Sequence, residues 1–399
     1  MNRYASKPLR KSYGAGCLEL RAGVLWLVFL LTTYLPGVFN GLGLLYAGEL
    51  PPQYAFEEIL IDAATSEEPF ATQYSSEAAL DYLEAGARAW SQDKQCISCH
   101  TNGSYALVRP MLSANLGSSP EWLRAFLMEE LEAYEAKQPE GLRKDIVPTQ
   151  LAYLAAGLAS WDRFHHQNIS VETDRALRLM FKAQSEDGSF LNEDCWPPLE
   201  SSHYQSATVA ALAVALAPAW SKDLMPSDPV AAKLDRLIQF LKNTPAPHDY
   251  ARVWLLWVDA WMPEWGLVET NQDWVQHLWE LQNSDGGWSM RSFADPEKWG
   301  DGSRADRLRS ETTRQRQASD GHMTGLICMV LKHCAVSDSH PSLRRGLSWL
   351  ETHQRESGRW WARSLNTDRY HFITYSATAF GLAALSETPR NKRVQFSEP

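Results

Sequence analysis

Two cysteines and a histidine are spaced for one specific chemistry. Residues 96–100 read Cys-Ile-Ser-Cys-His, the Cys-x-x-Cys-His pattern of covalent c-type haem attachment. Two thiols one turn apart can add to the two vinyl groups of a haem, and the adjacent imidazole then lies under the iron as an axial ligand. The pattern therefore predicts haem c held by Cys96 and Cys99, with His100 bound to the iron. A zinc half-site and a redox dithiol are the alternatives that the cysteines leave open.

The N-terminus carries the features of an export signal. Five basic residues, at positions 3, 7, 10, 11 and 21, precede an apolar run from Gly23 to Tyr34, and a second apolar stretch ends at Ala47. We expect residues 1–50 to be a signal peptide or a membrane anchor formed by residues 23–47. Positive charge before the apolar run keeps the N-terminus in the cytoplasm, so the rest of the chain is expected in the periplasm or on the outer face of the inner membrane. Bacteria attach c-type haem in that compartment.

Composition narrows the class of protein. The formal net charge of −10 argues against a nucleic-acid-binding protein. The four cysteines outside the motif do not form an obvious disulfide framework, since Cys328 and Cys334 lie six residues apart on one predicted helix, too far to bridge.

Most of the chain repeats one pattern. A helix ends in glutamine, a turn follows that often holds an acidic residue, a glycine and an aromatic residue, and a small-residue apolar run comes next. The four turns lie at 90–93, 184–190, 282–288 and 354–360. Such small-residue helices pack closely and suit an inner layer.

Helical periodicity and breaks at Gly and Pro predict twelve helices in six hairpins. The expected pairs are 77–94 with 104–117, 120–136 with 146–160, 171–185 with 203–217, 229–243 with 249–261, 271–283 with 319–335, and 341–354 with 371–386. Six hairpins of similar length close into a ring, so the predicted fold is an all-α ring covering residues 77–386 as a single domain. A linker at 51–76 precedes it and a polar tail at 387–399 follows it. An open solenoid of the same pairs is the alternative.

The Gln-turn-Trp segments resemble the QW repeats of squalene–hopene cyclases and other terpenoid cyclase or prenyltransferase-repeat proteins. Gln282–Trp288 is the best match, and Gln184–Phe190 is the next. The resemblance covers roughly residues 75–386 and implies an (α/α)6 toroid with a central apolar cavity and an isoprenoid or other lipid ligand. It also implies that the turns stitch the outer helices together.

The departures from that family concern its catalytic groups. Class II cyclases carry an Asp-x-Asp-Asp run whose middle acid protonates an alkene. The corresponding segment here, residues 202–209, reads Ser-His-Tyr-Gln-Ser-Ala-Thr-Val and has no carboxylate. Related prenyltransferase subunits hold zinc through an Asp, a Cys and a His, and Asp194, Cys195 and His203 offer those residue types at a compressed spacing.

Three further histidines open predicted inner helices. In a ring of hairpins, the turn after each outer helix lies at the same end as the start of the next inner helix. His203, His322 and His371 are therefore expected at the same mouth of the ring as His100. We expect His203, or failing that His322, to be the distal iron ligand, and all three are candidates for a catalytic acid or base. The alternative is that each is an ordinary residue at a helix start.

A thirty-residue insertion, Arg291–Asp320, separates the third turn from its inner helix. Its arginines could clamp haem propionates or a substrate phosphate, or the segment could be a solvated loop. These arginines are Arg304, Arg307, Arg309, Arg314 and Arg316.

Three functions fit these features. The first is a haem c protein on a cyclase-like toroid, a haem-dependent oxidoreductase or electron carrier with a redox partner protein. The second is a terpenoid cyclase-like enzyme, a degenerate isomerase that acts on an isoprenoid or lipid without haem. The third is a zinc-binding or non-enzymatic binding scaffold.

Overall fold

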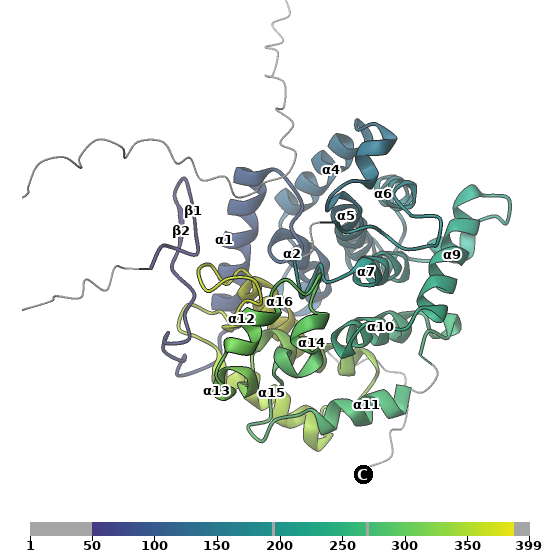
Figure 1. The fold of residues 1–399 in the computed structure, drawn as a ribbon. Coiled ribbons are helices and arrows are strands. Elements are labelled where there is room, and N and C mark those ends of the chain that lie inside the picture. The colour runs from purple at the N-terminus through teal and green to yellow at the C-terminus, as the bar shows by residue number, and fades with distance from the viewer. Residues whose placement is uncertain (1–49, 194–195, 269–270, 387–399) are drawn as a thin grey trace, which may run out of the picture. The chain divides into compact units, whose positions relative to one another are not determined.

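The computed structural model describes residues 50–193, 196–268 and 271–386. The expected N-terminal anchor, the polar tail and the Asp194–Cys195 pair lie outside these residues. The described part is mainly helical, which confirms the all-α class (Figure 1). No helix in these ranges combines the length and the apolar character that crossing a membrane requires.

Six helices form the outer members of the predicted pairs. Each has a half-buried pattern, with one face packed on the inner helices, and several begin at a side-chain cap such as Ser75, Ser170 or Asp228. They are α1 (Ser76–Lys94), α4 (Glu121–Glu135), α6 (Val171–Lys182), α9 (Pro229–Asn243), α11 (Asn271–Glu280) and α15 (Pro341–His353).

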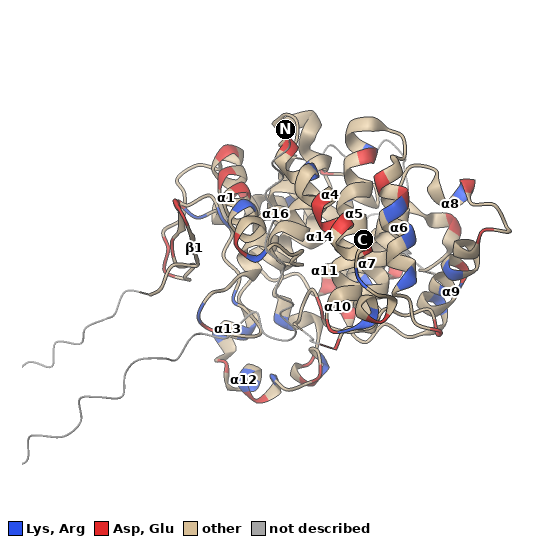
Figure 2. Ribbon diagram, turned by 90° about the horizontal axis from the view of Figure 1, so that it is seen from above, with Lys and Arg blue, Asp and Glu red and all other residues tan. Residues whose placement is uncertain are grey.

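The inner helices are buried nearly all round. Every residue of α5 is buried, and α5, α7 and α16 carry no Asp, Glu, Lys or Arg, so they are uniformly tan in Figure 2. These helices are α2 (Asn102–Val108), α5 (Val147–Trp161), α7 (His203–Leu216), α10 (Asp249–Trp261), α14 (Gly321–His333) and α16 (Ile373–Ser386). Small residues permit close approach: a Cβ on Gly325 of α14 would lie 2.5 Å from the backbone nitrogen of Gly381 in α16.

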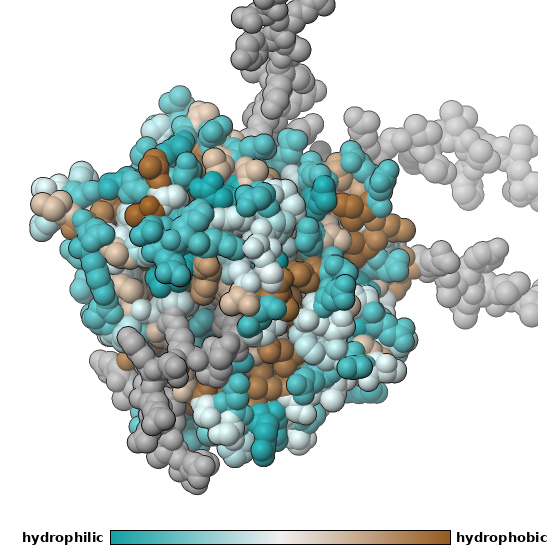
Figure 3. All heavy atoms as spheres, turned by 180° about the vertical axis from the view of Figure 1, so that it is seen from behind, coloured by the Kyte–Doolittle hydropathy of each residue, from teal (hydrophilic) through white to brown (hydrophobic). Residues whose placement is uncertain are grey.

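The inner helices contact one another in chain order. α2 packs on α5, α5 on α7, α7 on α10, α10 on α14 and α14 on α16, and α16 packs back on α2. Figure 1 shows these helices side by side, with the outer helices on their far sides. On the face drawn in Figure 3, hydrophilic side chains surround separate hydrophobic areas.

The observed helix bounds mostly lie within a few residues of the predicted ones, and α9 and α10 match them. The first inner helix differs. It ends at Val108 and continues as a 3₁₀ turn, Arg109–Leu112, and a single turn α3 (Ser113–Leu116). Pro110 explains the break, because proline cannot donate an intrahelical hydrogen bond.

The glutamines of the repeat turns join neighbouring outer helices. Gln184 Nε2 donates to the carbonyl of Lys233 in α9, 3.0 Å away, and Gln282 Nε2 to that of Ser342 in α15, 2.8 Å away. Gln354 Nε2 donates to the carbonyl of Ser75, 2.8 Å away, at the start of α1. The last bond links the final outer helix to the first.

The turn glycines are required by the backbone. Gly358 has a φ of +87°, and a Cβ there would lie 2.2 Å from the Ala78 carbonyl oxygen. We expect Gly358→Ala to lower the free energy of unfolding by about 3 kcal/mol in urea titrations, from the unfavourable φ and the clash together. Gly266→Ala is the matched control, since Gly266 has a φ of +58° and open space around it; it should cost about 1 kcal/mol. Equal losses would contradict the role of the clash.

The segment expected as a linker belongs to the folded unit. It contains the antiparallel hairpin of β1 (Tyr54–Phe56) and β2 (Ile59–Ile61), strands too short to produce a recognisable alternation. Buried Gln53 donates to the carbonyl of His371, 3.1 Å away, and Arg359 forms an ion pair of 2.7 Å with Glu68. These long-range contacts fix the segment against the C-terminal hairpin.

Candidate functional site

The Cys-x-x-Cys-His segment forms a tight turn between α1 and α2. Gln95 ends α1 with a left-handed φ of 49°. Asn102, the first residue of α2, holds the turn: its Oδ1 accepts from the Ser98 amide at 2.7 Å, and its Nδ2 donates to the Cys96 carbonyl at 3.0 Å. Gln150 of α5 donates to the Ile97 carbonyl at 2.8 Å. The backbone of the motif is therefore fixed by two inner helices.

The two motif cysteines differ in exposure, and neither forms a disulfide bond. Cys96 is half-buried and Cys99 is buried. Burial, together with the nearby Glu200 carboxyl, raises the pKa of the Cys99 thiol well above its usual range. Dithiol redox chemistry needs a thiolate, so this environment disfavours it. Within the described ranges, no group of three or more His, Cys, Asp and Glu residues is arranged to hold a metal ion.

The His100 imidazole lies between aromatic rings. It stacks on Phe372, with centroids 5.3 Å apart and planes at 10°, and meets Trp90 edge-on at 5.0 Å. Nδ1 lies 3.2 Å from the Ser98 hydroxyl oxygen, and Nε2 has no hydrogen bond to a described residue. Burial lowers the pKa of His100 to about 4, so the ring is neutral at physiological pH.

These residues fit a covalently attached haem. In the tautomer whose Nδ1 donates to Ser98, Nε2 is unprotonated, which is the form that binds iron. The rings of Trp90 and Phe372 pack against the His100 imidazole. A thioether at Cys99 is neutral, so it suits the buried position of that residue better than a thiolate. Haem attachment at these residues stays a prediction.

His203 does not share the surroundings of His100. It is the exposed first residue of α7, and no described contact joins it to the motif. It lies instead near Asp187 in the second repeat turn. Partial burial opposes ionisation of Asp187, but hydrogen bonds from Ser189 and the proximity of His203 lower its pKa overall. The residue expected as the distal ligand thus faces the outer turn.

His322 lies at the centre of the inner helices and is fully buried. Its Nε2 is 3.0 Å from the Tyr250 hydroxyl of α10, and its Nδ1 is 3.0 Å from the Ser376 hydroxyl of α16. Burial lowers its pKa to about 3. Because both nitrogens are engaged, His322 can bind iron only if one of these hydrogen bonds breaks.

His371 precedes the ring that stacks on His100. It is buried, with a φ of 46°, and its Nδ1 accepts a hydrogen bond of 3.1 Å from the Ser364 amide. That bond places the proton of the neutral ring on Nε2, so iron binding would require the other tautomer. The structure therefore brings Phe372, rather than any of the three expected histidines, to His100.

A buried polar cluster next to Cys99 was not predicted. It contains Glu200, Tyr153 and Tyr250, which come from three different segments. Burial raises the pKa of Tyr153 well above its usual range, with further contributions from Cys99, Tyr250 and Glu200. Glu200 lies two residues before residues 202–209, the segment that corresponds to the acidic run of the cyclases. An acidic residue directly before Ser201 and Ser202 was the sequence signal that could have pointed to this cluster.

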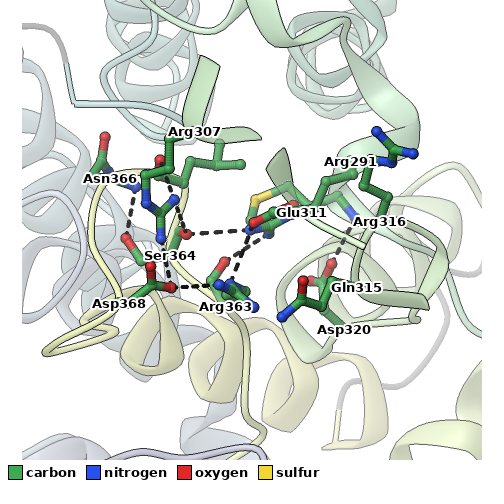
Figure 4. Close-up of polar contacts among 12 residues, drawn as sticks. Arg291, Arg307, Glu311, Gln315, Arg316, Asp320, Arg363, Ser364, Asn366 and Asp368 are labelled. Atoms are coloured by element: carbon green, nitrogen blue, oxygen red, sulfur yellow. Dashed lines mark hydrogen bonds and ion pairs between the residues drawn. The ribbon is translucent and has the colours of Figure 1, made fainter. Parts of the chain in front are cut away.

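The insertion is folded rather than a free loop. It contains the short helices α12 (Ala305–Ser310) and α13 (Thr313–Gln317). Glu311 is buried between two arginines: Arg291 Nη2 lies 2.8 Å away and Arg363 Nε 3.4 Å away (Figure 4).

Most of the arginines expected to clamp an anion already have partners. Arg307 pairs with Asp368 at 2.7 Å and donates to the carbonyl of Leu365 at 3.1 Å. Arg304 pairs with Asp301, and Arg309 with Glu297. The Arg307 contacts fasten the insertion to the loop that precedes α16, whereas the other two pairs lie within the insertion.

Comparisons with known proteins add no family. A scan against models of protein families gives no match, and neither does a search of curated protein sequences. Function must therefore be inferred from the motif and its surroundings.

Proposed function

We propose that the protein is an exported c-type haem protein, in which Cys96 and Cys99 hold the haem and His100 ligates the iron. The observation that carries this proposal is the state of His100. Nδ1 lies 3.2 Å from the Ser98 hydroxyl oxygen and Nε2 has no hydrogen bond to a described residue, while burial lowers the pKa of the imidazole to about 4. A haem bound there would supply a one-electron carrier. The protein then acts in electron transfer, or as a haem-dependent oxidoreductase, at the outer face of the inner membrane or in the periplasm.

The scaffold that we propose is a closed (α/α)6 toroid of the terpenoid cyclase type. Two observations support closure over an open solenoid. The inner helices contact in a cycle, with α16 against α2. The outer helices are joined by Gln354, whose side chain bonds the start of α1. An open superhelix would leave its first and last hairpins apart.

The chain's own residues set the environment of the haem in this proposal. Asn102 and Gln150 fix the backbone of the turn, so the two sulfur atoms and the imidazole keep the same positions relative to one another. Ser98 orients the imidazole through Nδ1. Trp90 and Phe372 exclude water from the faces of the His100 imidazole. This matters because axial ligation and burial are the protein's main controls on the reduction potential of a haem.

The test is an absorption spectrum of the full chain exported in bacteria with a working c-type maturation system, combined with metal analysis. We expect the Soret and α bands of a thioether-linked haem and about one iron per chain. One zinc per chain without haem would overturn the proposal in favour of the metal-site alternative.

Squalene cyclisation is not part of the proposed function. Residues 202–209 carry no carboxylate, and the nearby buried Glu200 is a single acid that interacts with the Cys99 thiol. Alkene protonation needs a strong acid held by neighbouring groups. We expect purified protein incubated with squalene in detergent to form no hopene above the level of heat-treated protein, measured by gas chromatography. Hopene formed with enzymatic turnover would favour the cyclase-like alternative. The same solvent extracts, analysed before incubation, report any isoprenoid or lipid that the protein carries.

A further inference from the structure

The insertion and the loop before α16 form a basic surface on an acidic protein. Residues 290–317 and 361–372 together contain nine basic and six acidic side chains, a formal charge of +3, whereas the whole chain carries −10. The two segments are held together by the Glu311 and Asp368 ion pairs (Figure 4). We call these two segments the basic patch.

Two arginines of the basic patch remain available to a partner. Arg314 and Arg369 are exposed, and neither pairs with an acidic side chain in the described ranges. The Arg369 guanidinium instead lies over the ring of Tyr370, 5.2 Å from its centroid. Arg291, by contrast, is buried and paired, so its role is to hold the patch in shape.

A stack of rings leads from the basic patch to the motif. Tyr370 is half-buried and stacks on Phe372, with centroids 5.4 Å apart and planes at 7°. Phe372 stacks in turn on His100 at 5.3 Å and 10°. Three nearly parallel rings therefore connect an arginine at the surface with the expected iron ligand.

We propose that the basic patch docks an acidic electron-carrier protein, and that Tyr370 and Phe372 mark its closest approach to the haem. This inference rests on the proposed haem attachment. With haem attached, the reaction would be the transfer of one electron from the ferrous haem to the oxidised carrier, with no bond formed or broken. Opposite charge guides such a partner to the patch and speeds the encounter, and the acidic remainder of the surface repels it.

The first experiment follows oxidation of the ferrous protein by ferricyanide, an anion, and by tris(phenanthroline)cobalt(III), a cation, in a stopped-flow instrument. The variant Arg314→Glu/Arg369→Glu should react about tenfold more slowly with ferricyanide at low salt and no more slowly with the cobalt complex. The difference should vanish at high salt, where charges are screened. The control, Lys182→Glu/Lys242→Glu, makes the same change in charge at exposed ends of α6 and α9 and should leave the ferricyanide rate nearly unchanged.

The second experiment does not need the haem. Calorimetric titration of the Cys96→Ala/Cys99→Ala protein with a ten-residue polyglutamate peptide should detect binding that the Arg314→Glu/Arg369→Glu changes abolish. Tyr370→Leu should keep the peptide binding but slow both oxidants in the haem-loaded protein. If haem is attached and the charge reversals alter neither rate nor binding, the docking surface is wrong while the haem assignment stands. If no haem is attached, the peptide titration still decides whether the patch binds an acidic partner.

Discussion

The Cys96→Ala/Cys99→Ala variant should lose covalent haem completely. Each thioether requires its own thiol, and neither Cys328 nor Cys334 is followed by the spacing that attachment needs. We expect wild-type protein to keep a peroxidase stain after denaturing electrophoresis and the double variant to show none. Each single variant keeps one thiol, so it should retain at most a fraction of the stain, from haem attached through a single thioether.

Cys334→Ala is the matched control for this experiment. Cys334 is half-buried, like Cys96, and lies at the end of α14 outside the motif. Its replacement should leave the stain at wild-type intensity, and circular dichroism should show helical content in all variants. A stain that survives in the double variant would mean that the haem, if present, is attached elsewhere.

The sequence predicted the helices well where they carry local signals. α9 begins after Asp228 and at Pro229, a cap followed by a proline at the first helical position, and its bounds match the prediction. The insertion gave no such signal. Its fold depends on Glu311 meeting Arg363, fifty-two positions later, and that contact follows from tertiary packing.

The motif could be recognised from sequence, but its surroundings could not. Phe372 reaches His100 across 272 positions because α16 packs against α2, and periodicity does not specify which side chain arrives there. His203 shows the converse limit. A position at a helix start fixes the end of the helix at which a residue lies but not the direction of its side chain. The next residue, Tyr204, already points its hydroxyl at the Leu241 carbonyl of α9.

The protein should unfold cooperatively as the pH falls from about 6.5 towards 4. Three buried histidines outside the motif stay neutral in the folded state, because burial lowers their pKa to about 4 for His248 and His371 and to about 3 for His322. In the unfolded chain a histidine takes up a proton near pH 6.5. Between these values the unfolded state binds more protons, so the free energy of unfolding falls with decreasing pH, by about 1.4 kcal/mol per pH unit for each histidine. Asp320, whose pKa burial raises, opposes this trend, but it is one group against three.

Urea titrations from pH 7 to pH 4.5 measure this slope, and His322→Gln isolates one of its components. The variant will be less stable throughout, since it loses the bonds to Tyr250 and Ser376, but the slope of its unfolding free energy should be smaller by about 1.4 kcal/mol per pH unit. An unchanged slope in His322→Gln would mean that this imidazole is protonated in the folded protein. The chain of hydrogen bonds from Tyr250 in α10 through His322 to Ser376 in α16 would then have an imidazolium at its centre.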